Sequence, residues 1–514
     1  MGAPFLRLAY VQVDVVAGAA EAVRGEAIWC ATRVRASASE SRMERFIVSG
    51  PRAFGGRIVQ EIRRIDLKWA RRCGVVREDG GAWTMKRWVS LAVMATLAFA
   101  MIAVTPAGAA IELKFYYPIG VSGPLAKVMN GLVDDFNMAH PGVHVTPIFS
   151  GDYYQTMTKV QTAVMGGAPP DVAVLLSTDL FTLLDMHAII PLDGFIQQAG
   201  GERFRADFFS AFLRNSQIGN TTYSIPFQRS TIVLYYNQDA FRKAGLDPHA
   251  PPKNWTELIS DAQKLTIKDA SGHVTQWGVG IPTSGNTYWV YQGFVIEAGQ
   301  ARLANPEGTQ VFFDTPGTHA ALALWLRLAA MGVEPSGITD WGTLPTAFAN
   351  GQFAMIYHST GSLTFIRDNA KFSFGTAFMP AGRVSGTPTG GGNLYIFQGI
   401  PVDHQRAAWQ FVQWMTAPQQ AARWSEASGY VAVRQSAFGV ASYKAYTDKF
   451  PQALTARDQL AYAQAELATH QSGQIQLMYS DHLQAVLTGR QTLDQGLSTA
   501  QQEATKILAP FQRR

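Results

Sequence analysis

Aromatic and small hydroxylated residues gather where segments of regular structure are expected to end. Tyr153 and Tyr154 follow a strand-like run and a glycine. Tyr288 and Trp289 follow a Pro-Thr-Ser-Gly stretch, and Ser230 precedes the apolar run TIVLYY. Flat rings cover the carbon face of a polyol or sugar, and hydroxyl groups bond to its oxygens. The pattern indicates a site for a small hydroxyl-rich solute, although each ring taken alone also suits a hydrophobic core.

Catalytic and metal-binding patterns are missing from the same part of the chain. It contains no HExxH, GxSxG, P-loop or GxGxxG sequence. His140 and His144 flank a Pro-Gly turn, which favours a turn contact over metal binding. Asp134 and Asp135 are adjacent on an expected helix and point in different directions, so they do not form a carboxylate pair. We therefore expect a protein that is not an enzyme and holds no cofactor or metal.

Length and composition indicate a folded chain with more than one lobe. Its 514 residues exceed what one hydrophobic core usually organises, and 47% hydrophobic against 16% charged residues argues against bulk disorder. The net charge of +5 comes from the first 87 residues, because the remainder holds 27 basic and 29 acidic residues. A nucleic-acid-binding role therefore lacks electrostatic support. Cys30 and Cys73 also precede the main body, which excludes disulfides and thiolate sites from it.

A targeting segment precedes the main body. Residues 88–110 carry no charge, follow a Met-Lys-Arg sequence, and end with the small residues Ala107 and Ala109. A basic start, an apolar centre and a small-residue end are typical of a cleaved secretory signal. An uncleaved membrane anchor is the alternative, because the apolar run approaches the roughly 20 residues that span a bilayer. We predict a signal peptide over 85–109, with residues 1–84 as a disordered or non-native extension.

The body that follows alternates strand-like and helix-like segments, and this order predicts an α/β lobe with a largely parallel sheet. The expected elements are a strand over 111–117, an amphipathic helix over 124–138, a strand over 143–148, a helix over 155–165 and a strand over 172–176.

Further along, start and stop signals predict more helices and strands. They are a capping box over 254–257, a helix over 320–331, a strand over 353–357 with a helix entry at 359–362, three glycines before a strand over 393–397, and a helix stripe at Ala408, Phe411, Val412 and Met415. Ser359 and Gly361 in the helix entry either cap the helix or offer backbone N–H groups to an anion.

Several segments resemble family 1 extracellular solute-binding proteins of ABC importers. In family order they are IPFQRSTIVLYYNQDAFRKAGLD (225–247), PPKNWTELISDAQKL (251–265), GQFAMIYHSTGSL (351–363) and the stretch from Ala407 to Phe438. The resemblance implies a two-lobed, type II-like periplasmic-binding-protein fold with a hinge and an interlobe ligand cleft. It places lobe 1 at about 110–225 plus part of 350–400, and lobe 2 at about 235–345 plus the C-terminal helices, within a solute-binding body of residues 110–514.

Within the family the segments are most similar to members that bind sn-glycerol 3-phosphate, and the likeness implies ligand contacts. The tyrosine of GDYYQ, the serine of the PFxxS turn, the serine that opens STGS, the second glycine of GGG and the tyrosine of SGY match the family's binding positions, and one tryptophan matches a ring that borders the ligand's glycerol end. These positions are Tyr153, Ser230, Ser359, Gly391, Tyr430 and Trp289.

Three departures from that pattern leave the ligand open. The family's acidic position is Leu176-Ser177 here, its C-terminal arginine is Gln476, and a second tryptophan is lost near Asn286. Loss of a fixed cation weakens the binding of a phosphomonoester. Arg229 or His358 is the expected substitute for that cation, with a surface charge as the alternative interpretation of Arg229. The resemblance thus implies capture of sn-glycerol 3-phosphate or a glycerophosphodiester, with a polyol or sugar as the alternative.

The expected role is that of a periplasmic receptor, exported by a cleaved signal and acting as a monomer. It would bind ligand between its lobes and deliver it to a membrane permease that an ATPase powers, without contact to nucleic acid. The rival from another class is a secreted hydrolase, which needs two carboxylates about 5–10 Å apart across the pocket. A membrane-anchored sensor lobe is a third alternative.

Overall fold

The computed structural model describes residues 110–512. The predicted signal peptide, the extension before it and both cysteines lie outside the described residues, so those predictions stay untested. Within the described range, no helix combines the length and the apolar character needed to cross a membrane.

One mixed sheet runs through this part of the chain. Its strand order is β10-β6-β11-β3-β1-β2, with β12 beside β11 and β9 beside β6. Because β1 pairs in parallel with both β2 and β3, the predicted parallel β-α-β-α-β unit is confirmed. The strands are β1 (Ile111–Tyr117), β2 (Val143–Phe149), β3 (Val172–Leu176), β4 (Gln217–Ile218), β5 (Thr221–Thr222), β6 (Ile225–Asn237), β7 (Ile267–Lys268), β8 (Val274–Gln276), β9 (Met355–Ser359), β10 (Phe374–Ala377), β11 (Thr387–Ile396) and β12 (Ala463–Gln464).

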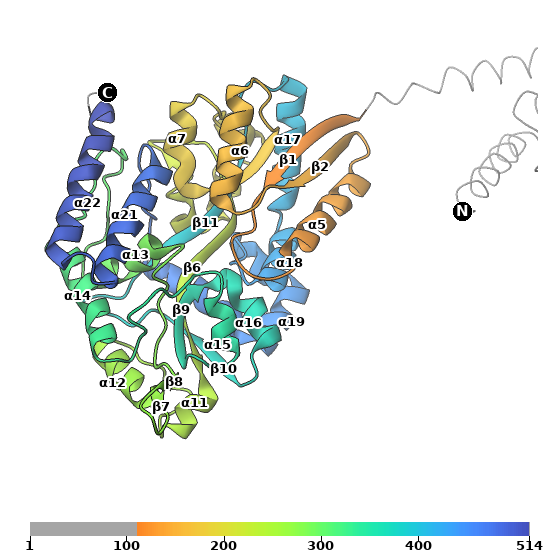
Figure 1. Ribbon diagram of the computed structural model, residues 1–514. Coiled ribbons are helices and arrows are strands. Elements are labelled where there is room, and N and C mark those ends of the chain that lie inside the picture. The colour runs from red at the N-terminus through yellow and green to blue at the C-terminus, as the bar shows by residue number, and fades with distance from the viewer. Residues whose placement is uncertain (1–109, 513–514) are drawn as a thin grey trace, which may run out of the picture. The chain divides into compact units, whose positions relative to one another are not determined.

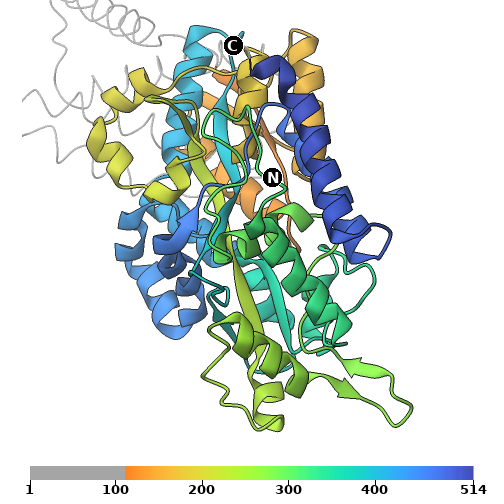
Figure 2. The same ribbon diagram turned by 90° about the vertical axis from the view of Figure 1, so that its left-hand side faces the viewer.

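Helices cover the sheet, and α21 and α22 form an adjacent pair near the C-terminus (Figure 1). Turned by 90°, the molecule shows the light-green β7–β8 hairpin extending away from the other elements (Figure 2). The helices are α5 (Leu125–Ala139), α6 (Tyr153–Met165), α7 (Leu180–Asp185), α8 (Asp193–Gln198), α9 (Glu202–Ala206), α10 (Ser210–Leu213), α11 (Gln238–Lys243), α12 (Trp255–Leu265), α13 (Thr287–Glu297), α14 (Pro316–Ala330), α15 (Leu344–Ala349), α16 (Leu363–Asn369), α17 (Val402–Met415), α18 (Pro418–Ser428), α19 (Ala441–Lys449), α20 (Thr455–Gln459), α21 (Ser472–Leu487) and α22 (Leu493–Leu508).

The alternation of residues in β1 explains how the first part of the sheet is covered. Leu113, Phe115 and Tyr117 are buried, while the charged residues Glu112 and Lys114 are exposed. Phe411 on α17 lies 5.0 Å, ring to ring, from both Phe115 and Phe136, so α17 packs against both β1 and α5. Each buried side chain of this size contributes about 1.5–3 kcal/mol. The predicted helix stripe that includes Phe411 is confirmed.

The crossing strands β6 and β11 were only partly predicted. All 13 residues of β6 are buried, and β11 runs antiparallel between β6 and β3. The prediction that the three glycines precede a strand is wrong, because 390–392 lie inside β11. A Cβ on Gly390 would stand 2.1 Å from the ring of Trp289, and one on Gly391 would stand 2.0 Å from the carbonyl oxygen of Gln228. Glycine continues this strand because its neighbours leave no room for a side chain.

The helix start at Asn254 differs in detail from the predicted capping box. The Asn254 side chain accepts a hydrogen bond from the backbone N–H of Glu257 at 3.0 Å, as predicted. The Glu257 carboxylate accepts from the backbone N–H of Lys253 at 2.7 Å and from the Asn254 side-chain amide at 2.8 Å. Glu257 therefore reaches one residue further back than the predicted pattern requires.

The core contains separate clusters of buried side chains. One gathers β1, β2, α5, α17 and α18, and another gathers α12, α13, α14, α21 and α22. Strand β6 contributes to both, since Phe227 belongs to the first cluster and Ile232 to the second. Such a strand connects two cores. The predicted lobe boundaries, however, stay a prediction.

Candidate ligand-binding site

A cavity of about 180 Å³ opens where several strands end. Its wall comes from the loop after β1, the start of α6, the ends of β3 and β9, the middle of β6 and β11, the start of α13, and three loops. Ligands of α/β proteins collect at such strand ends. The lining residues are Gly120, Val121, Asp152, Tyr153, Tyr154, Leu176, Ser230, Gly285, Asn286, Tyr288, Trp289, Trp341, Ser359, Gly391, Tyr430 and Glu466.

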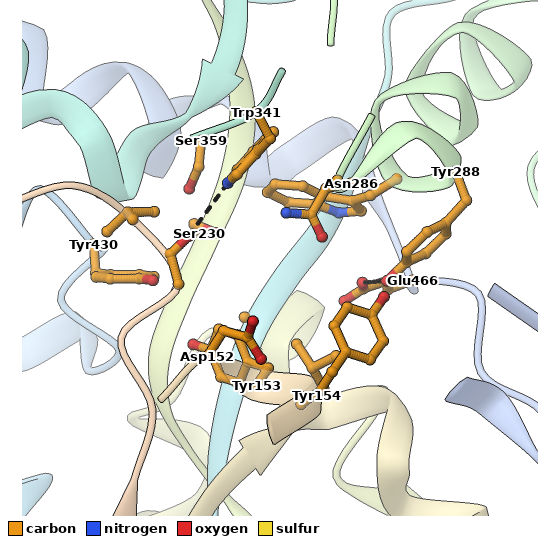
Figure 3. Close-up of a pocket in the computed structure, with 16 residues that line it drawn as sticks. Asp152, Tyr153, Tyr154, Ser230, Asn286, Tyr288, Trp341, Ser359, Tyr430 and Glu466 are labelled. Carbon is orange, nitrogen blue, oxygen red and sulfur yellow. Dashed lines mark hydrogen bonds between the residues drawn. The ribbon is translucent and has the colours of Figure 1, made fainter. Parts of the chain in front are cut away.

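Six of the seven predicted ligand-binding residues line this cavity, although they come from six different elements or loops. They are Tyr153, Ser230, Trp289, Ser359, Gly391 and Tyr430. Figure 3 shows the side chains of many lining residues directed toward the same space. Their role in binding a ligand stays a prediction.

Tyr153 opens helix α6, and the preceding residue holds that helix start in place. The Asp152 side chain accepts from the backbone N–H of Gln155 at 2.8 Å, which caps the helix. The Tyr153 hydroxyl donates to the Gln228 side chain on β6 at 3.1 Å. Burial, together with neighbouring Tyr430, raises the pKa of Tyr153 well above its usual value. Tyr153 is therefore a neutral hydroxyl fixed against the crossing strand.

Ser230, Ser359 and Tyr430 lie together at one end of the cavity (Figure 3). The Ser359 hydroxyl oxygen accepts from the backbone N–H of Gly361 at 3.0 Å, so the helix-capping interpretation of this serine is confirmed. A Cβ on Gly361 would stand 2.9 Å from the Tyr430 ring, which shows how closely that ring packs on the backbone. This end offers neutral hydroxyl groups.

Two indole rings meet at the cavity. Trp289 donates its indole N–H to the carbonyl oxygen of Thr389 at 2.9 Å, which fixes the ring beside β11. Trp341 lies 5.8 Å away, ring to ring, at an angle of 61°. The sequence indicated loss of a second tryptophan near Asn286, and Asn286 does line the cavity. Trp341, from a different part of the chain, supplies a second indole ring beside Trp289.

Arg229 does not reach the cavity, so its prediction as a ligand-binding residue is not supported by its position. Successive side chains of a strand point to opposite faces, and Ser230 takes the cavity face. Arg229 is fully buried, donates to the carbonyl oxygen of Gly391 at 2.8 Å, and lies 5.3 Å from the ring centre of Phe212. Burial lowers the pKa of this guanidinium to about 10, and Glu466 partly counteracts the shift.

His358 is also a poor substitute for the missing cation. Its Nε2–H donates to the carbonyl oxygen of Trp341 at 3.0 Å, so its Nδ1 accepts from the Ser362 hydroxyl at 3.0 Å. The ring stacks on that of Trp341 at 3.8 Å. Burial lowers the pKa of His358 to about 4. The imidazole is therefore neutral near pH 7 and serves to hold Trp341.

The positions at which the family has an acid and a C-terminal arginine differ in their relation to the cavity. Leu176 lines the cavity and makes its wall apolar where the family has an acid. Ser177 faces an adjoining crevice instead. Gln476 on α21 is buried outside the cavity and donates to the carbonyl oxygen of Leu467 at 3.0 Å. Among the described residues that line the cavity, none is Lys, Arg or His.

Glu466 supplies an acid that sequence reasoning missed. It follows the two-residue strand β12, so no motif marks it, and its carboxylate accepts from the Tyr288 hydroxyl at 2.7 Å. Its other oxygen has no hydrogen-bond partner within residues 110–512. Burial raises the pKa of Glu466 to about 7, while Tyr288 and Arg229 counteract the shift. Trp341 was missed for the same reason, since only the fold brings its loop to the cavity.

Residues 110–512 hold no cluster of three or more His, Cys, Asp or Glu residues arranged to bind an ion. The chemistry available to the cavity consists of aromatic faces, neutral hydroxyl groups, one amide and the carboxylates of Asp152 and Glu466.

Comparison with known proteins identifies the family. Residues 131–451 match the family model described as bacterial extracellular solute-binding protein. The chain belongs to this family. As a solute-binding protein it is 29% identical over 452 residues to the sn-glycerol-3-phosphate-binding periplasmic protein UgpB of Yersinia enterocolitica, a match that covers 83% of this chain and 98% of that protein.

Solved structures share the fold of this solute-binding protein. UgpB from Mycobacterium tuberculosis in complex with glycerophosphocholine is 24% identical, with a TM-score of 0.69 over 78% of this chain and 99% of that one. A solute-binding protein from Thermotoga lettingae bound with alpha-D-tagatose is 22% identical, with a TM-score of 0.67 over 78% and 100%. The predicted two-lobed periplasmic-binding-protein fold is confirmed.

Proposed function

We propose that this protein is the periplasmic receptor of an ABC importer and that it captures a glycerophosphodiester in the cavity at the strand ends. The observation that supports this most is the cavity wall, in which aromatic rings and neutral hydroxyls from distant elements converge. A glycerol unit presents carbon–hydrogen faces to rings and hydroxyls to polar groups.

Charge favours a diester over a phosphomonoester. Near pH 7 a monoester carries close to two negative charges, and binding proteins usually balance such charge with Arg or Lys. The described lining residues include no such cation but two carboxylates, Asp152 and Glu466. A diester carries one negative charge, so it meets less repulsion. The neighbour bound to glycerophosphocholine supports a diester, whereas the relatives named for sn-glycerol 3-phosphate support glycerol phosphate compounds in general.

A thermal-shift screen followed by calorimetry tests this function. The panel contains sn-glycerol 3-phosphate, glycerophosphocholine, glycerophosphoinositol, a disaccharide and a polyol. A ligand present at a hundred times its dissociation constant should stabilise the protein by about 2.7 kcal/mol. We expect the diesters to stabilise the protein more than the monoester. A shift with the disaccharide alone would replace the proposed ligand class, and no shift with any compound would oppose the receptor role.

A neutral sugar is the second candidate ligand, because the same rings and hydroxyls suit a pyranose. The neighbour bound with alpha-D-tagatose supports this alternative. A sugar would leave the negative charge of Glu466 unbalanced, although its hydroxyls can donate to that carboxylate. The disaccharide in the panel decides between the two classes.

Hydrolysis is the candidate from another class, since Asp152 and Glu466 both line the cavity. Asp152 is engaged in capping α6, and Glu466 accepts from Tyr288, so both carboxylates have structural roles. We propose that the protein releases its ligand intact. Phosphorus and proton NMR of glycerophosphocholine kept with the protein should show unchanged ligand, whereas free choline or glycerol 3-phosphate would indicate an enzyme.

Export by a cleaved signal and a monomeric state belong to the same proposal. A receptor of this kind would present its closed form to a permease whose transport an ATPase powers. Mass spectrometry of the exported protein is expected to find residue 110 at its start, and light scattering is expected to give the mass of one chain. A retained segment before residue 88 would overturn the proposed processing.

A further inference from the structure

The two ends of the cavity differ in chemistry. Ser230, Ser359 and Tyr430 lie at one end, and Tyr154, Tyr288 and Glu466 lie at the other (Figure 3). The first group offers neutral hydroxyls, whereas the second combines phenol rings with a carboxylate. A ligand with two unlike ends would therefore bind in one orientation.

Glu466 lacks a charge partner in the cavity itself. Its side chain is 4% exposed, and only one of its two carboxylate oxygens has a hydrogen-bond partner within the described chain. The nearest cation that influences it, Arg229, is buried behind the wall and is not among the lining residues. A buried carboxylate without full compensation is costly, so a positively charged ligand group placed there would be favoured.

A second acid strengthens the negative potential at this end. Asp179 is buried, one of its oxygens has no hydrogen-bond partner among residues 110–512, and it lines a crevice that shares Tyr153, Tyr154 and Leu176 with the main cavity. Burial and the nearby Glu466 raise the pKa of Asp179 to about 7. Two carboxylates therefore influence the space beside Tyr154, and a cation would relieve their mutual repulsion.

The rings at this end suit an alkylammonium group. Tyr154 and Tyr288 both line the cavity, and the face of a tyrosine ring attracts cations within about 6 Å. Quaternary ammonium groups are recognised by such aromatic surfaces because they carry diffuse charge and no N–H donor. A primary ammonium would instead donate directly to the free oxygen of Glu466.

We infer that Glu466, Tyr154 and Tyr288 form a subsite for the alkylammonium end of a zwitterionic glycerophosphodiester. This inference rests on the proposed function and names the group that distinguishes the ligand from other glycerol phosphates. The phosphodiester then points toward the hydroxyl end formed by Ser230, Ser359 and Tyr430. The bound ligand is neutral overall, which matches a cavity without a lining cation.

Calorimetry with a set of matched diesters tests the subsite. The purified protein and its Glu466→Gln variant are titrated with glycerophosphocholine, glycerophosphoethanolamine and glycerophosphoinositol, the last of which lacks a cation. We expect the parent protein to bind the two cationic esters at least tenfold more tightly than it binds the inositol ester. Glu466→Gln should weaken their binding at least tenfold and leave the inositol ester unchanged or tighter.

Two further variants keep the test decisive. Glu112→Gln removes one charge from the exposed side of β1, outside the cavity, and should change no affinity. Tyr154→Leu alters a partly exposed ring, so folding should survive, and it should weaken the cationic esters more than the inositol ester. Melting curves confirm that each variant is folded.

The outcomes separate the inference from the function on which it rests. Equal affinity for the choline and inositol esters, or an equal loss for both in Glu466→Gln and Tyr154→Leu, would overturn the cationic subsite while leaving the diester receptor intact. Binding of a disaccharide with no binding of any diester would overturn both. Binding of the cationic esters with the expected selective losses supports both.

Discussion

At the scale of single residues, the cavity separates ring contacts from charge. Trp289 and Tyr153 present rings to the ligand space, while their polar atoms bond to the protein at Thr389 and Gln228. These polar contacts fix the orientation of each ring. The rings therefore contribute mainly by covering apolar ligand surface, and Glu466 contributes mainly through its charge.

Loss of a ring should weaken binding without unfolding the protein. Removal of the buried contact in Trp289→Ala or Tyr153→Ala corresponds to about 1.5–3 kcal/mol, or roughly a tenfold to hundredfold loss of affinity. Calorimetry with the best ligand from the screen measures this loss, and circular dichroism checks folding. Tyr153→Phe is the control, since it keeps the ring and should lose less affinity than Tyr153→Ala. Unchanged affinity in both alanine variants would show that the ligand binds elsewhere.

Glu466 should make stability depend on pH. Its folded-state pKa of about 7 lies above the ordinary value of 4.5, so in this pH window the unfolded chain releases the proton first. The parent protein therefore loses stability as pH rises from about 4.5 through 7, and Glu466→Gln lacks this loss. Between pH 5 and pH 8 the free energy of unfolding of the variant should rise by on the order of 1–3 kcal/mol relative to that of the parent. Urea denaturation at both pH values measures the difference, and a constant difference would contradict the raised pKa.

At the scale of elements, the contact between β6 and β11 positions the middle of the site. Gly391 has φ of +91°, a conformation that glycine adopts without strain. Ser230 pairs with Gly390 across these strands, next to the lining residue Gly391, so a shift of either strand would move Ser230 and Gly391 relative to each other. Close backbone approach at this point is a requirement of the fold.

Gly391→Ala should destabilise the protein by more than about 3 kcal/mol. The new Cβ would stand 2.0 Å from the backbone carbonyl oxygen of Gln228, in addition to the cost of positive φ. Gly489→Ala is the matched control, because its φ is +74° and nothing lies within 4 Å of the added Cβ. Its expected cost is about 1 kcal/mol. Thermal and urea unfolding compare the two, and equal losses would show that β11 can shift to accommodate the methyl group.

At the scale of the whole described body, two loops meet beside the cavity. Trp341 donates its indole N–H to the carbonyl oxygen of Gly120 at 3.2 Å, and the Ser122 hydroxyl donates to the carbonyl oxygen of Gly342 at 3.4 Å. These bonds join the loop after β1 to the loop before α15. In a hinged receptor such bonds form on closure, so ligand should favour the state that contains them.

Trp341→Phe should weaken ligand binding through this loop contact. The variant keeps an aromatic ring and loses one N–H donor, which corresponds to about 0.5–1.5 kcal/mol, or roughly twofold to tenfold in affinity. Small-angle scattering should show a smaller radius of gyration with ligand than without it, and a smaller ligand effect in the variant. Trp325→Phe is the control, because its N–H donates to Glu334 in the core at 2.9 Å. A ligand effect identical in parent and Trp341→Phe would exclude this contact from closure.

The sequence alone determined the helices and strands whose capping residues and spacing of apolar side chains predict the same element. The β-α-β-α-β order, the buried stripe of α17 and the helix entry after Ser359 follow from the spacing of apolar residues and from side-chain capping. Six site positions were also found from the sequence, since they lie in segments whose residues match the family's pattern.

Only the tertiary structure decided which charges and rings reach the cavity. Neighbouring residues of β6 face opposite sides, so Ser230 lines the cavity and Arg229 is buried behind it. Trp341 and Glu466 lie outside the matched segments and follow no motif, yet the fold brings both to the wall. Local signals fix secondary structure because they act over a few residues, whereas the charge of a binding site depends on side chains that meet only after distant segments pack.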